Sequence, residues 1–454
     1  MVLMNPTDAV FLIPETRQSP MHVGGLQVFE LPPDHQPDHV RKMYERLLEA
    51  TDVAPLFRRR PYRSVTTLGQ WAWEEDDEID LEHHVRHSAL PHPGTVRELL
   101  ALVSRLHGTL LDRSRPLWEA HLIEGLEGDR FAVYTKIHHA LADGVNALRI
   151  GLMALSLDPD DPEMRVPWAA PPKEDKRRLP SPSVITSLPG QAVSAATDLL
   201  GLGPRFAKRA VEAVIREQAN ALPKPAPKTM FNVNITGARR FAAQSWELPR
   251  IKAVGKAVGG SVNDVVLAMC GGALRTYLIE MDALPDSSLI AMVPVSLAPA
   301  TGTGGNAVGA TLCPLSTDLD DPAARLRLIH EAQQRNKESF AGLSQLQATA
   351  VSVPVMAPLT LNAMIGLHKL VTPFNLVISN VPGPPMPLYW GGAHLQGMWP
   401  LSIPMDGQAL NITVLSNDGK VGFGLTGCRS KVPHLQRMLT YLDDDLNALE
   451  TALL

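Results

Sequence analysis

Cysteine, aromatic side chains and excess positive charge are all scarce in this 454-residue sequence. Its three cysteines, Cys270, Cys313 and Cys428, are odd in number and show no CxxC spacing. We therefore predict neither a disulfide framework nor a zinc site, and interpret them as small packing residues in a reducing cytoplasm. Aromatic residues make up 5% of the chain and the formal net charge is −5, which argues against a nucleic-acid-binding surface.

Long hydrophobic runs are also missing, although 45% of the residues are hydrophobic. No run reaches the roughly 18 uninterrupted apolar residues that a membrane-spanning helix needs. The N-terminal stretch Met1–Pro6 has no basic region followed by an apolar one, so no signal peptide is indicated. We expect a soluble or peripheral protein with ample material for a hydrophobic core.

The chain shows both helix and strand signals, in two halves that are joined by a crossover. At roughly 100–200 residues per domain, two or three domains are expected. Proline and charged residues are concentrated at 158–182, and a second Pro/Lys tract follows a predicted helix at 184–221. We therefore divide the chain into a first lobe at 1–160, a crossover at 161–230 and a second lobe at 231–454.

Hydrophobic periodicity predicts the main elements of the first half. Apolar side chains at helical spacing predict a helix over 96–110, and a second helix follows Gly144. Strand-like runs at 116–123 and 131–138 flank a turn that contains glycine and aspartate, which predicts a hairpin between the two helices.

The second half shows a helix start and several strands. Ser261 or Asn263 is expected to cap the helix, and Asn417-Asp418-Gly419 is typical of a hairpin turn. The strands predicted in this half are 289–295, 374–379, 410–416 and 421–426.

The segment His138-His139-Ala140-Leu141-Ala142-Asp143-Gly144 lies between a predicted strand and a predicted helix. Successive side chains at the end of a strand point in opposite directions, so one histidine can face a cavity while the other packs inside. Histidine suits a general base near neutral pH, as acyl transfer to an alcohol requires. Asp143, followed by Gly144, suits an organising turn rather than a second base.

The sequence gives less support to a metal site, a serine nucleophile or a nucleotide-binding loop. The second histidine pair, His83-His84, lacks a following Asp-Gly and is interpreted as structural. Adjacent histidines on a strand cannot readily share one metal ion, and the sequence has no HExxH motif or cysteine partner. It also has no GxSxG motif for a serine nucleophile, and the glycine-rich stretch 302–309 lacks the lysine of a P-loop.

Several motifs, taken together and in order, resemble those of the bacterial wax ester synthase/diacylglycerol acyltransferase family, within the chloramphenicol acetyltransferase-like superfamily. The resemblance covers essentially the whole chain. The matching stretches are Pro6–Asp8, Pro116–Glu119, His138–Gly144, Asn263–Ala268, Val293–Ser296, Gly305-Asn306 and Ser379–Pro384.

The resemblance implies a two-lobed α/β fold of the chloramphenicol acetyltransferase type, with mixed sheets flanked by helices and an active-site tunnel between the lobes. It implies transfer of a fatty acyl group from acyl-CoA, as co-substrate, to a long-chain alcohol or to diacylglycerol. No metal, other cofactor or covalent acyl-enzyme is expected. By motif, His139 is the expected general base in a direct ternary-complex mechanism, and His138 supports the site. Asp143 is expected to orient the loop through a buried charged contact, and Gly144 to leave space for substrate.

Four residues outside the histidine motif also have expected roles. Asn263 either donates a hydrogen bond to the developing oxyanion or to substrate, or caps a helix, and Asp264 is expected to support it. Trp118 is expected to pack, and Glu119 to bind backbone or an arginine.

Lipid substrates imply a route from a membrane or a lipid droplet. The apolar stretch 350–371 either lines an acyl pocket, touches a bilayer or forms a buried core helix. The basic clusters Arg58–Arg60 and Lys176–Arg178 either attract CoA phosphates and anionic lipids or are solvated charge. We expect a cytoplasmic protein that associates peripherally with membranes or lipid droplets.

Two alternatives remain open from the sequence alone. One is a carrier-protein-dependent condensation or polyketide-type acyltransferase, which would take its acyl donor from a carrier protein rather than from CoA. The other is a non-catalytic, lipid-binding homologue that kept the fold, although the intact histidine motif argues against it.

Overall fold

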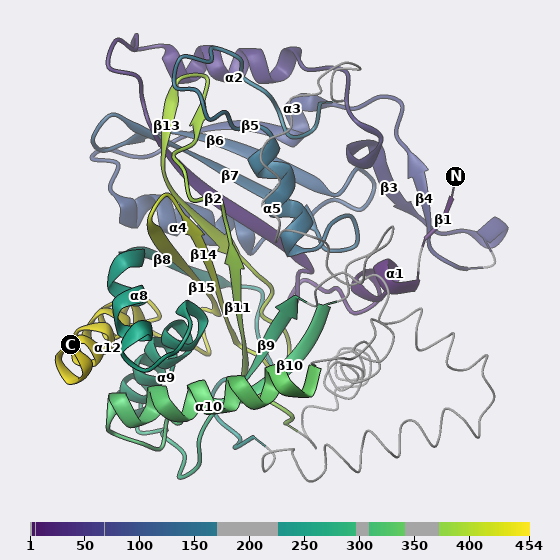
Figure 1. Ribbon diagram of the computed structural model, residues 1–454. Helices are drawn as coiled ribbons and strands as arrows, with labels where there is room; N and C mark the ends of the chain where they lie inside the picture. Colours follow the sequence, from purple (N-terminus) through teal and green to yellow (C-terminus); the bar gives the residue numbers. More distant parts are fainter. Residues whose placement is uncertain (1, 5, 68, 170–225, 297–307, 341–371) are drawn as a thin grey trace.

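Two six-stranded sheets lie one above the other, each with its own helices (Figure 1). The computed structural model describes residues 2–4, 6–67, 69–169, 226–296, 308–340 and 372–454. The predicted helix at 184–221, most of the glycine-rich stretch 302–309 and the apolar stretch 350–371 lie outside the described residues.

The first sheet has strand order β12-β13-β2-β7-β6-β5, and all its neighbours are antiparallel except β5 and β6. Its strands are β2 (His22–Glu30), β5 (Val85–Ala89), β6 (Trp118–Leu126), β7 (Arg130–His138), β12 (Tyr389–Trp390) and β13 (Ala393–Leu401). The predicted hairpin between the first two helices is confirmed, because β6 pairs with β7.

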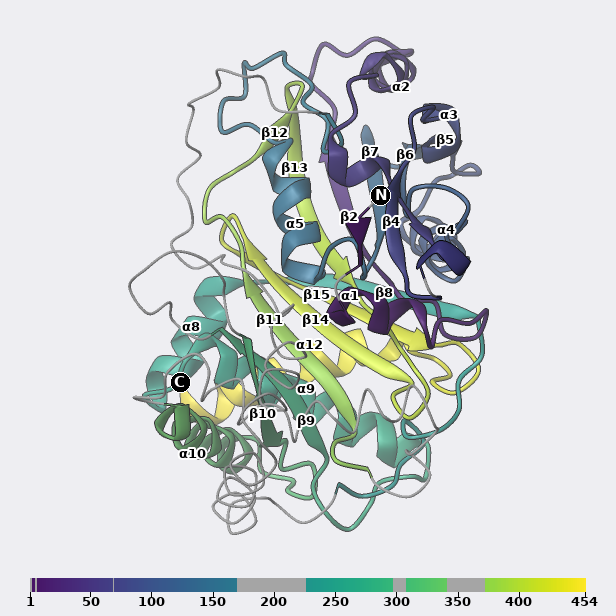
Figure 2. The same ribbon diagram turned by 90° about the vertical axis from the view of Figure 1, so that its right-hand side faces the viewer.

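Helices cover both faces of the first sheet (Figure 2). Along β7, Phe131 and Val133 point into the cluster that contains Leu152, from α5 (Gly144–Met153). Ala132 and Tyr134 point the other way, into the cluster that contains Leu99 and Val103 of α4 (Val96–His107). This alternation is the period-two pattern expected for a strand buried on both faces.

The second sheet has strand order β10-β9-β11-β14-β15-β8, and β11 runs parallel to both β9 and β14. Its strands are β8 (Arg239–Glu247), β9 (Ile290–Ser296), β10 (Val308–Pro314), β11 (Leu376–Pro382), β14 (Leu410–Asn417) and β15 (Lys420–Cys428). The predicted turn between β14 and β15 is confirmed: Asp418 and Gly419 both have positive φ, at 43° and 70°, as a two-residue type I′ hairpin requires.

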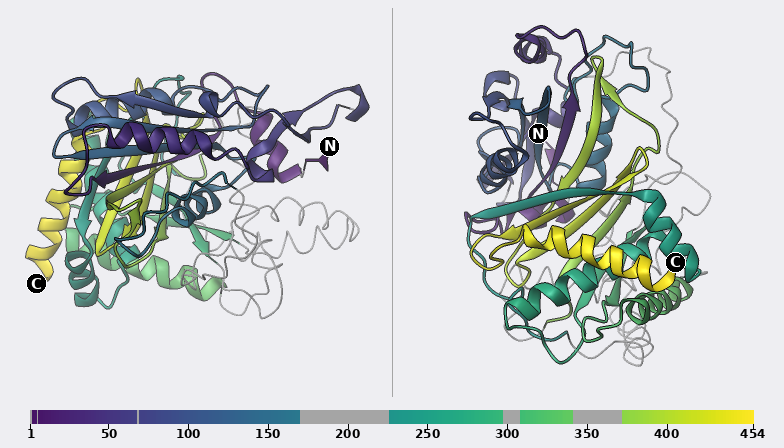
Figure 3. Two further views of the ribbon diagram at one scale, coloured as in Figure 1. Left: turned by 90° about the horizontal axis from the view of Figure 1, so that it is seen from above. Right: turned by 90° about the vertical axis from the view of Figure 1, so that its left-hand side faces the viewer.

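Four helices lie together on the outer side of the second sheet (Figure 3): α8 (Leu248–Ala257), α9 (Val262–Glu280), α10 (Pro322–Phe340) and α12 (Arg437–Leu453). Of the two predicted caps, Ser261 is correct, since it forms a capping box with Asp264 at the start of α9. By length and composition α9 could cross a membrane, but 72% of its most apolar window is buried inside the protein. This makes α9 the central helix of the lobe.

The lobes are not contiguous in sequence. Strands β12 and β13 come after most of the second sheet in the chain, yet β13 pairs with β2 and completes the first sheet. The predicted division at 160 and 230 did not include this exchange of strands. At the junction, β13 also lies against β15, where Gly422 and Gly424 face its backbone: a Cβ on Gly424 would lie 2.1 Å from the carbonyl oxygen of Pro400.

The remaining described elements lie around the first sheet. They are β1 (Val2–Leu3), α1 (Pro6–Leu12), α2 (His39–Glu49), the short 3-10 helices at Pro55–Arg58 and Val65–Thr67, β3 (Arg59–Tyr62), β4 (Ala72–Glu75) and α3 (Leu81–His84). Strands β1, β4 and β3 form a small separate sheet beside α1 (Figure 1).

Candidate active site

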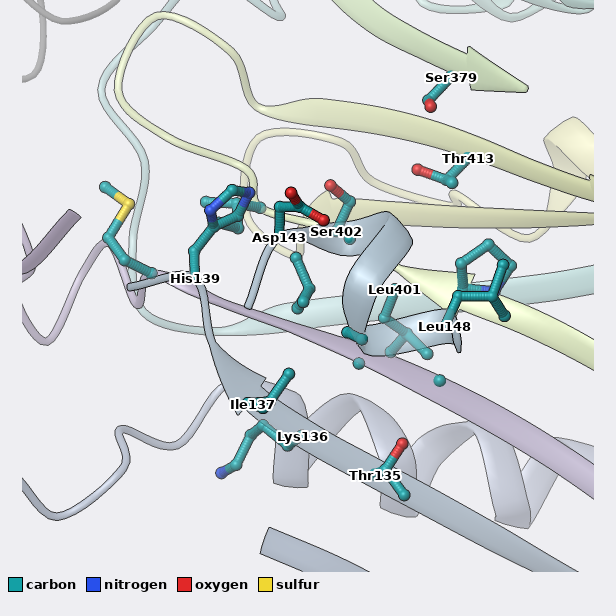
Figure 4. A pocket seen from close by; sticks show the side chains of 18 of the residues that line it. Thr135, Lys136, Ile137, His139, Asp143, Leu148, Ser379, Leu401, Ser402 and Thr413 are labelled. Atoms are coloured by element: carbon teal, nitrogen blue, oxygen red, sulfur yellow. The ribbon is translucent and has the colours of Figure 1, made fainter. Parts of the chain in front are cut away.

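A cavity of about 360 Å³ lies at the junction of the two lobes and is lined mainly by apolar side chains. The first lobe contributes the ends of β2 and β7, the start of α5 and residues of α1; the second lobe contributes β11, β14 and the loop after β13. His139, Asp143, Ser402, Ser379 and Thr413 are among its polar lining residues (Figure 4).

The two adjacent histidines point in different directions, as the strand geometry predicted. His138 is the last residue of β7, is fully buried and does not line the cavity. His139 follows it and lines the cavity (Figure 4). Its backbone N–H donates to the carbonyl oxygen of Met21 at 2.9 Å, and its ring stacks on Phe11, with ring centroids 4.0 Å apart. The backbone of His139 is therefore fixed by Met21, and its imidazole packs face to face on an aromatic ring.

Burial lowers the pKa of His139 to about 4, and the neighbouring His138 contributes in the same direction. The described surroundings of His139 are mostly apolar, so the charged imidazolium loses more hydration than the neutral ring. At neutral pH the ring is thus neutral and able to accept a proton.

His138 is held by a buried carboxylate that the sequence analysis did not single out. Its Nδ1 accepts a hydrogen bond from the backbone N–H of Ala140 at 3.0 Å, so Nε2 carries the proton and faces Glu15 Oε1 at 3.3 Å. Glu15 Oε1 also accepts from the N–H of Met21 at 2.8 Å, and Oε2 accepts a forked pair from Arg113 at 2.9 and 3.0 Å. Glu15 therefore supports both the ring of His138 and the backbone segment that holds His139.

Burial alone would raise the pKa of the Glu15 carboxyl, but the contacts with His138, Met21 and Arg113 outweigh it and lower that pKa. A single acidic residue in a polar loop gives no sequence signal that it is buried, which is why Glu15 was missed.

Asp143 and Gly144 lie at the start of α5 and both line the cavity. Asp143 caps the helix: its carboxylate accepts from the backbone N–H of Asn146 at 2.8 Å and from the Asn146 side chain at 3.1 Å. A Cβ built on Gly144 would meet no atom within 4 Å, so the space beside it is open. These positions agree with an organising role for Asp143 and with free room at Gly144.

Two family models match the chain: the wax ester synthase/diacylglycerol acyltransferase catalytic domain over residues 4–266, and the C-terminal domain of the same family over residues 304–450. The chain belongs to the wax ester synthase/diacylglycerol acyltransferase family. As a member of this family, it is an acyltransferase.

Named relatives in this family are similar to the chain over nearly their whole length. A protein named probable diacylglycerol O-acyltransferase from Mycobacterium tuberculosis is 52% identical over 455 residues, covering 100% of this chain and 99% of the relative. The O-acyltransferase WSD from Acinetobacter baylyi is 40% identical over 448 residues, covering 98% of this chain and 96% of the relative.

Solved structures agree with the family and with the fold. The wax ester synthase/diacylglycerol acyltransferase from Marinobacter aquaeolei VT8 is 44% identical, has a TM-score of 0.78 and covers 99% of both chains. The starter condensation domain of rhizomide synthetase has a TM-score of 0.61 at 12% identity, covering 100% of this chain and 95% of that domain, and therefore shows the fold alone. The two-lobed fold of the chloramphenicol acetyltransferase type is confirmed.

The Asn263-Asp264 pair of this acyltransferase does not line the cavity. The possible capping role of Asn263 is wrong, since Ser261 caps α9; Asn263 Oδ1 instead accepts from Asn380 Nδ2 at 3.4 Å. Asp264 is fully buried, and its Oδ2 accepts from the Ser261 N–H and from His330 Nδ1, both at 2.8 Å. The carboxylate of Asp264 thus caps α9 and joins it to α10, and its role in supporting Asn263 stays a prediction.

Glu119 is the centre of a buried charged network that also reaches the cavity wall. Its carboxylate lies 3.0 Å from Lys136 Nζ, 3.2 Å from His121 Nε2 and 3.3 Å from Arg86. The arginine contact was expected and the lysine and histidine were not. Trp118 packs as predicted, stacked on His84, whose Nδ1 contacts the Trp118 carbonyl at 2.8 Å.

The other charged and histidine clusters have structural partners. Arg58 pairs with Asp77 and Arg60 with Glu74, so these two residues of the Arg58–Arg60 cluster are neutralised locally. The second cluster, Lys176–Arg178, lies outside the described residues. Within the described part of the chain, no group of three or more His, Cys, Asp or Glu side chains is arranged to hold a metal ion.

Proposed function

We propose that the chain transfers a fatty acyl group from acyl-CoA to the hydroxyl of a long-chain alcohol or of diacylglycerol, with His139 as the general base. The observation that carries this proposal is the position of His139 in the wall of an apolar cavity between two lobes, where burial lowers the pKa of its imidazole. The names of the Mycobacterium relative, a probable diacylglycerol O-acyltransferase, and of the Marinobacter wax ester synthase/diacylglycerol acyltransferase support the choice of acceptor.

The reaction needs one proton carrier and no covalent acyl-enzyme. Neutral His139 removes the proton of the acceptor hydroxyl as its oxygen attacks the thioester carbonyl carbon, which gives a tetrahedral intermediate. The C–S bond then breaks, and the imidazolium returns the proton to the departing CoA thiolate. The products are the ester and free CoA, and His139 is neutral again. We propose that no metal or other cofactor takes part.

The supporting residues act through His139 and the shape of the cavity. In this proposal His138 and Glu15 fix the peptide segment that carries the base, and Asp143 fixes the turn that leads into α5. The open space at Gly144 leaves room for substrate beside the base.

We also propose that the protein works in the cytoplasm, at the surface of a membrane or lipid droplet. Val2, Leu3 and Ile13 have exposed fractions of 69%, 61% and 55%, and they flank α1, whose Val10 and Phe11 line the cavity. An apolar surface beside the cavity fits delivery of lipid from an interface. Co-flotation of the protein with lipid vesicles tests this part of the proposal.

The test of the base is His139→Ala, assayed by CoA release from palmitoyl-CoA with hexadecanol or diacylglycerol as acceptor. We expect a loss of roughly 10²–10⁴-fold in kcat with the thermal unfolding midpoint unchanged, because general-base help is of that size. His83→Ala is the matched control and should keep full activity. Full activity of His139→Ala would contradict the assignment.

The pH profile adds an independent measurement. Because the pKa of His139 is lowered to about 4, its imidazole becomes protonated only at a lower pH than an ordinary histidine. The acid limb of the kcat/KM profile should therefore lie near pH 4. An acid limb at about 6.5, the ordinary value for histidine, would argue against His139 in this environment.

A further inference from the structure

Four arginines surround a surface hollow of about 410 Å³ near the junction of the two lobes, and we call it the arginine hollow. They are Arg17, Arg105, Arg239 and Arg429. Arg105 is in the last turn of α4, Arg17 is in the loop that follows α1, and Arg239 and Arg429 flank the antiparallel pair β8 and β15. Helix α4 lies along β8 in this region (Figure 2).

The charge of these arginines is not compensated nearby. Among the described residues, none of the four forms an ion pair within 4.0 Å. Many arginines on other faces do, such as Arg250, which lies 2.6 Å from Glu450. The charge of Arg239 is favoured by Cys428 and by the carboxylate of Asp406, which also accepts from the backbone N–H of Ile235.

Two further arginines, Arg97 and Arg240, strengthen the positive field. The pKa of Arg240 is lowered by burial and by the charges of Arg429 and Arg97, which places like charges close together. The C-terminal end of α4 carries only about half a negative elementary charge, so it cannot balance a cluster of this size. Isolated arginines such as Arg46 and Arg327 also lack a described ion pair, but they do not converge on a hollow.

The arginine hollow shares its walls with the catalytic cavity. In the loop between α1 and β2, Pro14 and Met21 line the cavity, whereas Arg17 and Gln18, between them, line the hollow. Arg239, which is 4% exposed, donates to the carbonyl oxygen of Gln18 at 2.7 Å and to that of Pro404 at 3.5 Å, and it also bonds Thr236.

The neighbours of Pro404, Ile403 and Met405, line the cavity from the other lobe. The hollow and the cavity are thus back to back, separated by two loop segments that Arg239 joins. One of these segments carries Met21, whose carbonyl oxygen accepts from the N–H of His139.

We propose that the arginine hollow binds the phosphate groups of the acyl-CoA donor. Guanidinium groups bind phosphate oxygens through forked, charge-assisted hydrogen bonds, and several converging arginines suit a ligand with several phosphates. The pantetheine arm of the donor joins these phosphates to the thioester, and it would have to pass the two loop segments to bring the thioester to His139 in the apolar cavity. This inference rests on the proposed use of acyl-CoA and names the part of the protein that recognises its nucleotide end.

The test uses the double variant Arg105→Gln/Arg429→Gln, because both side chains are exposed and neither holds the backbone in place. Arg239 is left unchanged, since it joins two segments and its loss could disturb folding. The matched control is Arg46→Gln/Arg327→Gln, which removes the same charge from exposed positions elsewhere. The donors are palmitoyl-CoA and S-palmitoyl-pantetheine, which lacks the phosphates, with hexadecanol as acceptor.

We expect KM for palmitoyl-CoA to rise roughly 10- to 100-fold in the hollow variant, as the loss of charged hydrogen bonds implies, with kcat nearly unchanged. KM for S-palmitoyl-pantetheine should stay the same, and the control variant should match the wild type for both donors. Unchanged KM for palmitoyl-CoA, or an equal rise for both donors, overturns the proposal.

Direct binding of CoA, measured by calorimetry, separates this inference from the proposed base. His139→Ala should bind CoA like the wild type, and the hollow variant should bind it more weakly. If His139→Ala stays active but the hollow variant loses CoA, only the assignment of the base fails. If the wild type does not bind CoA, the hollow is not its site and this proposal is overturned.

Anionic lipid headgroups also carry phosphate groups, so the binding of both variants to lipid vesicles is measured as well. The hollow variant should bind phosphatidylglycerol vesicles as the wild type does. Loss of vesicle binding with an unchanged KM for palmitoyl-CoA would show a headgroup site instead, and would overturn the proposal.

Discussion

At the scale of single residues, Glu15 shows how the catalytic segment is held. One oxygen of its carboxylate faces His138 and accepts from Met21, and the other accepts the fork of Arg113. The side chain of Glu15 is 2% exposed, so these contacts are made with almost no competing water. Of the residues in this group, His139 and Met21 line the cavity and Glu15 does not; Glu15 is a positioning residue that acts through its neighbours.

Glu15→Gln keeps the size of the side chain and removes its charge. We expect kcat to fall by roughly 10-fold or more, since small misplacement of a catalytic group is costly, with KM for acyl-CoA little changed. The acid limb of the pH profile should also move to lower pH, because a buried anion near His139 favours its charged imidazolium and the substitution removes that anion. Glu45→Gln breaks an exposed ion pair and serves as control. A parallel loss of kcat and unfolding midpoint, without a shift of the acid limb, would indicate a purely structural role.

At the scale of elements, the sequence predicted those strands and helices whose signals are local. The alternation in β7, the turn at Asp418-Gly419 and the cap at Ser261 depend on neighbouring residues, and all three predictions are confirmed. Strand β13 was missed, because its partner β2 lies more than 360 positions earlier in the chain and pairing over that distance leaves no periodic signal. Glu15 and the arginine hollow were missed for the same reason: only the folded chain brings their contacts together.

The contact between β13 and β15 gives a test at this scale. Gly424→Ala would place its Cβ 2.1 Å from the Pro400 carbonyl oxygen, so β13 must move away from the second sheet. We expect a loss of about 1–3 kcal/mol in the free energy of unfolding, the usual cost of overpacking. Gly151→Ala, in α5, meets no atom within 4 Å and should be neutral or slightly stabilising. Equal stabilities of the two variants in urea unfolding would contradict this account of the junction.

At the scale of the whole molecule, the buried charges of the first lobe link stability to pH. Burial alone would raise the pKa of Glu119, but His121, Lys136 and Arg86 outweigh it and lower that pKa to about 2. The folded state therefore binds the Glu119 proton less tightly than the unfolded state, whose carboxyl has the ordinary value of 4.5. The resulting stabilisation is present above about pH 4.5 and is lost as the pH falls towards 2.

Glu119→Gln isolates this contribution. At pH 7 it should lower the free energy of unfolding by about 3–5 kcal/mol, because Lys136, which is 1% exposed, is left without its buried anion. The difference between wild type and variant should shrink below pH 4.5, as urea unfolding at several pH values would measure. Glu280→Gln, at an exposed ion pair with Arg437, is the control. A difference that stays constant down to pH 3 would contradict the depressed pKa.

The exchange of β12 and β13 between the halves of the chain also has a consequence for biosynthesis. When the ribosome has completed residues 1–160, strand β2 is still an unpaired edge, because its neighbour β13 lies at 393–401. An uncovered strand edge is a template for pairing with other chains. The first sheet can therefore be completed only after nearly the whole polypeptide has been synthesised. Until then the free edge of β2 is exposed, and a chaperone that covers it would prevent pairing with other chains.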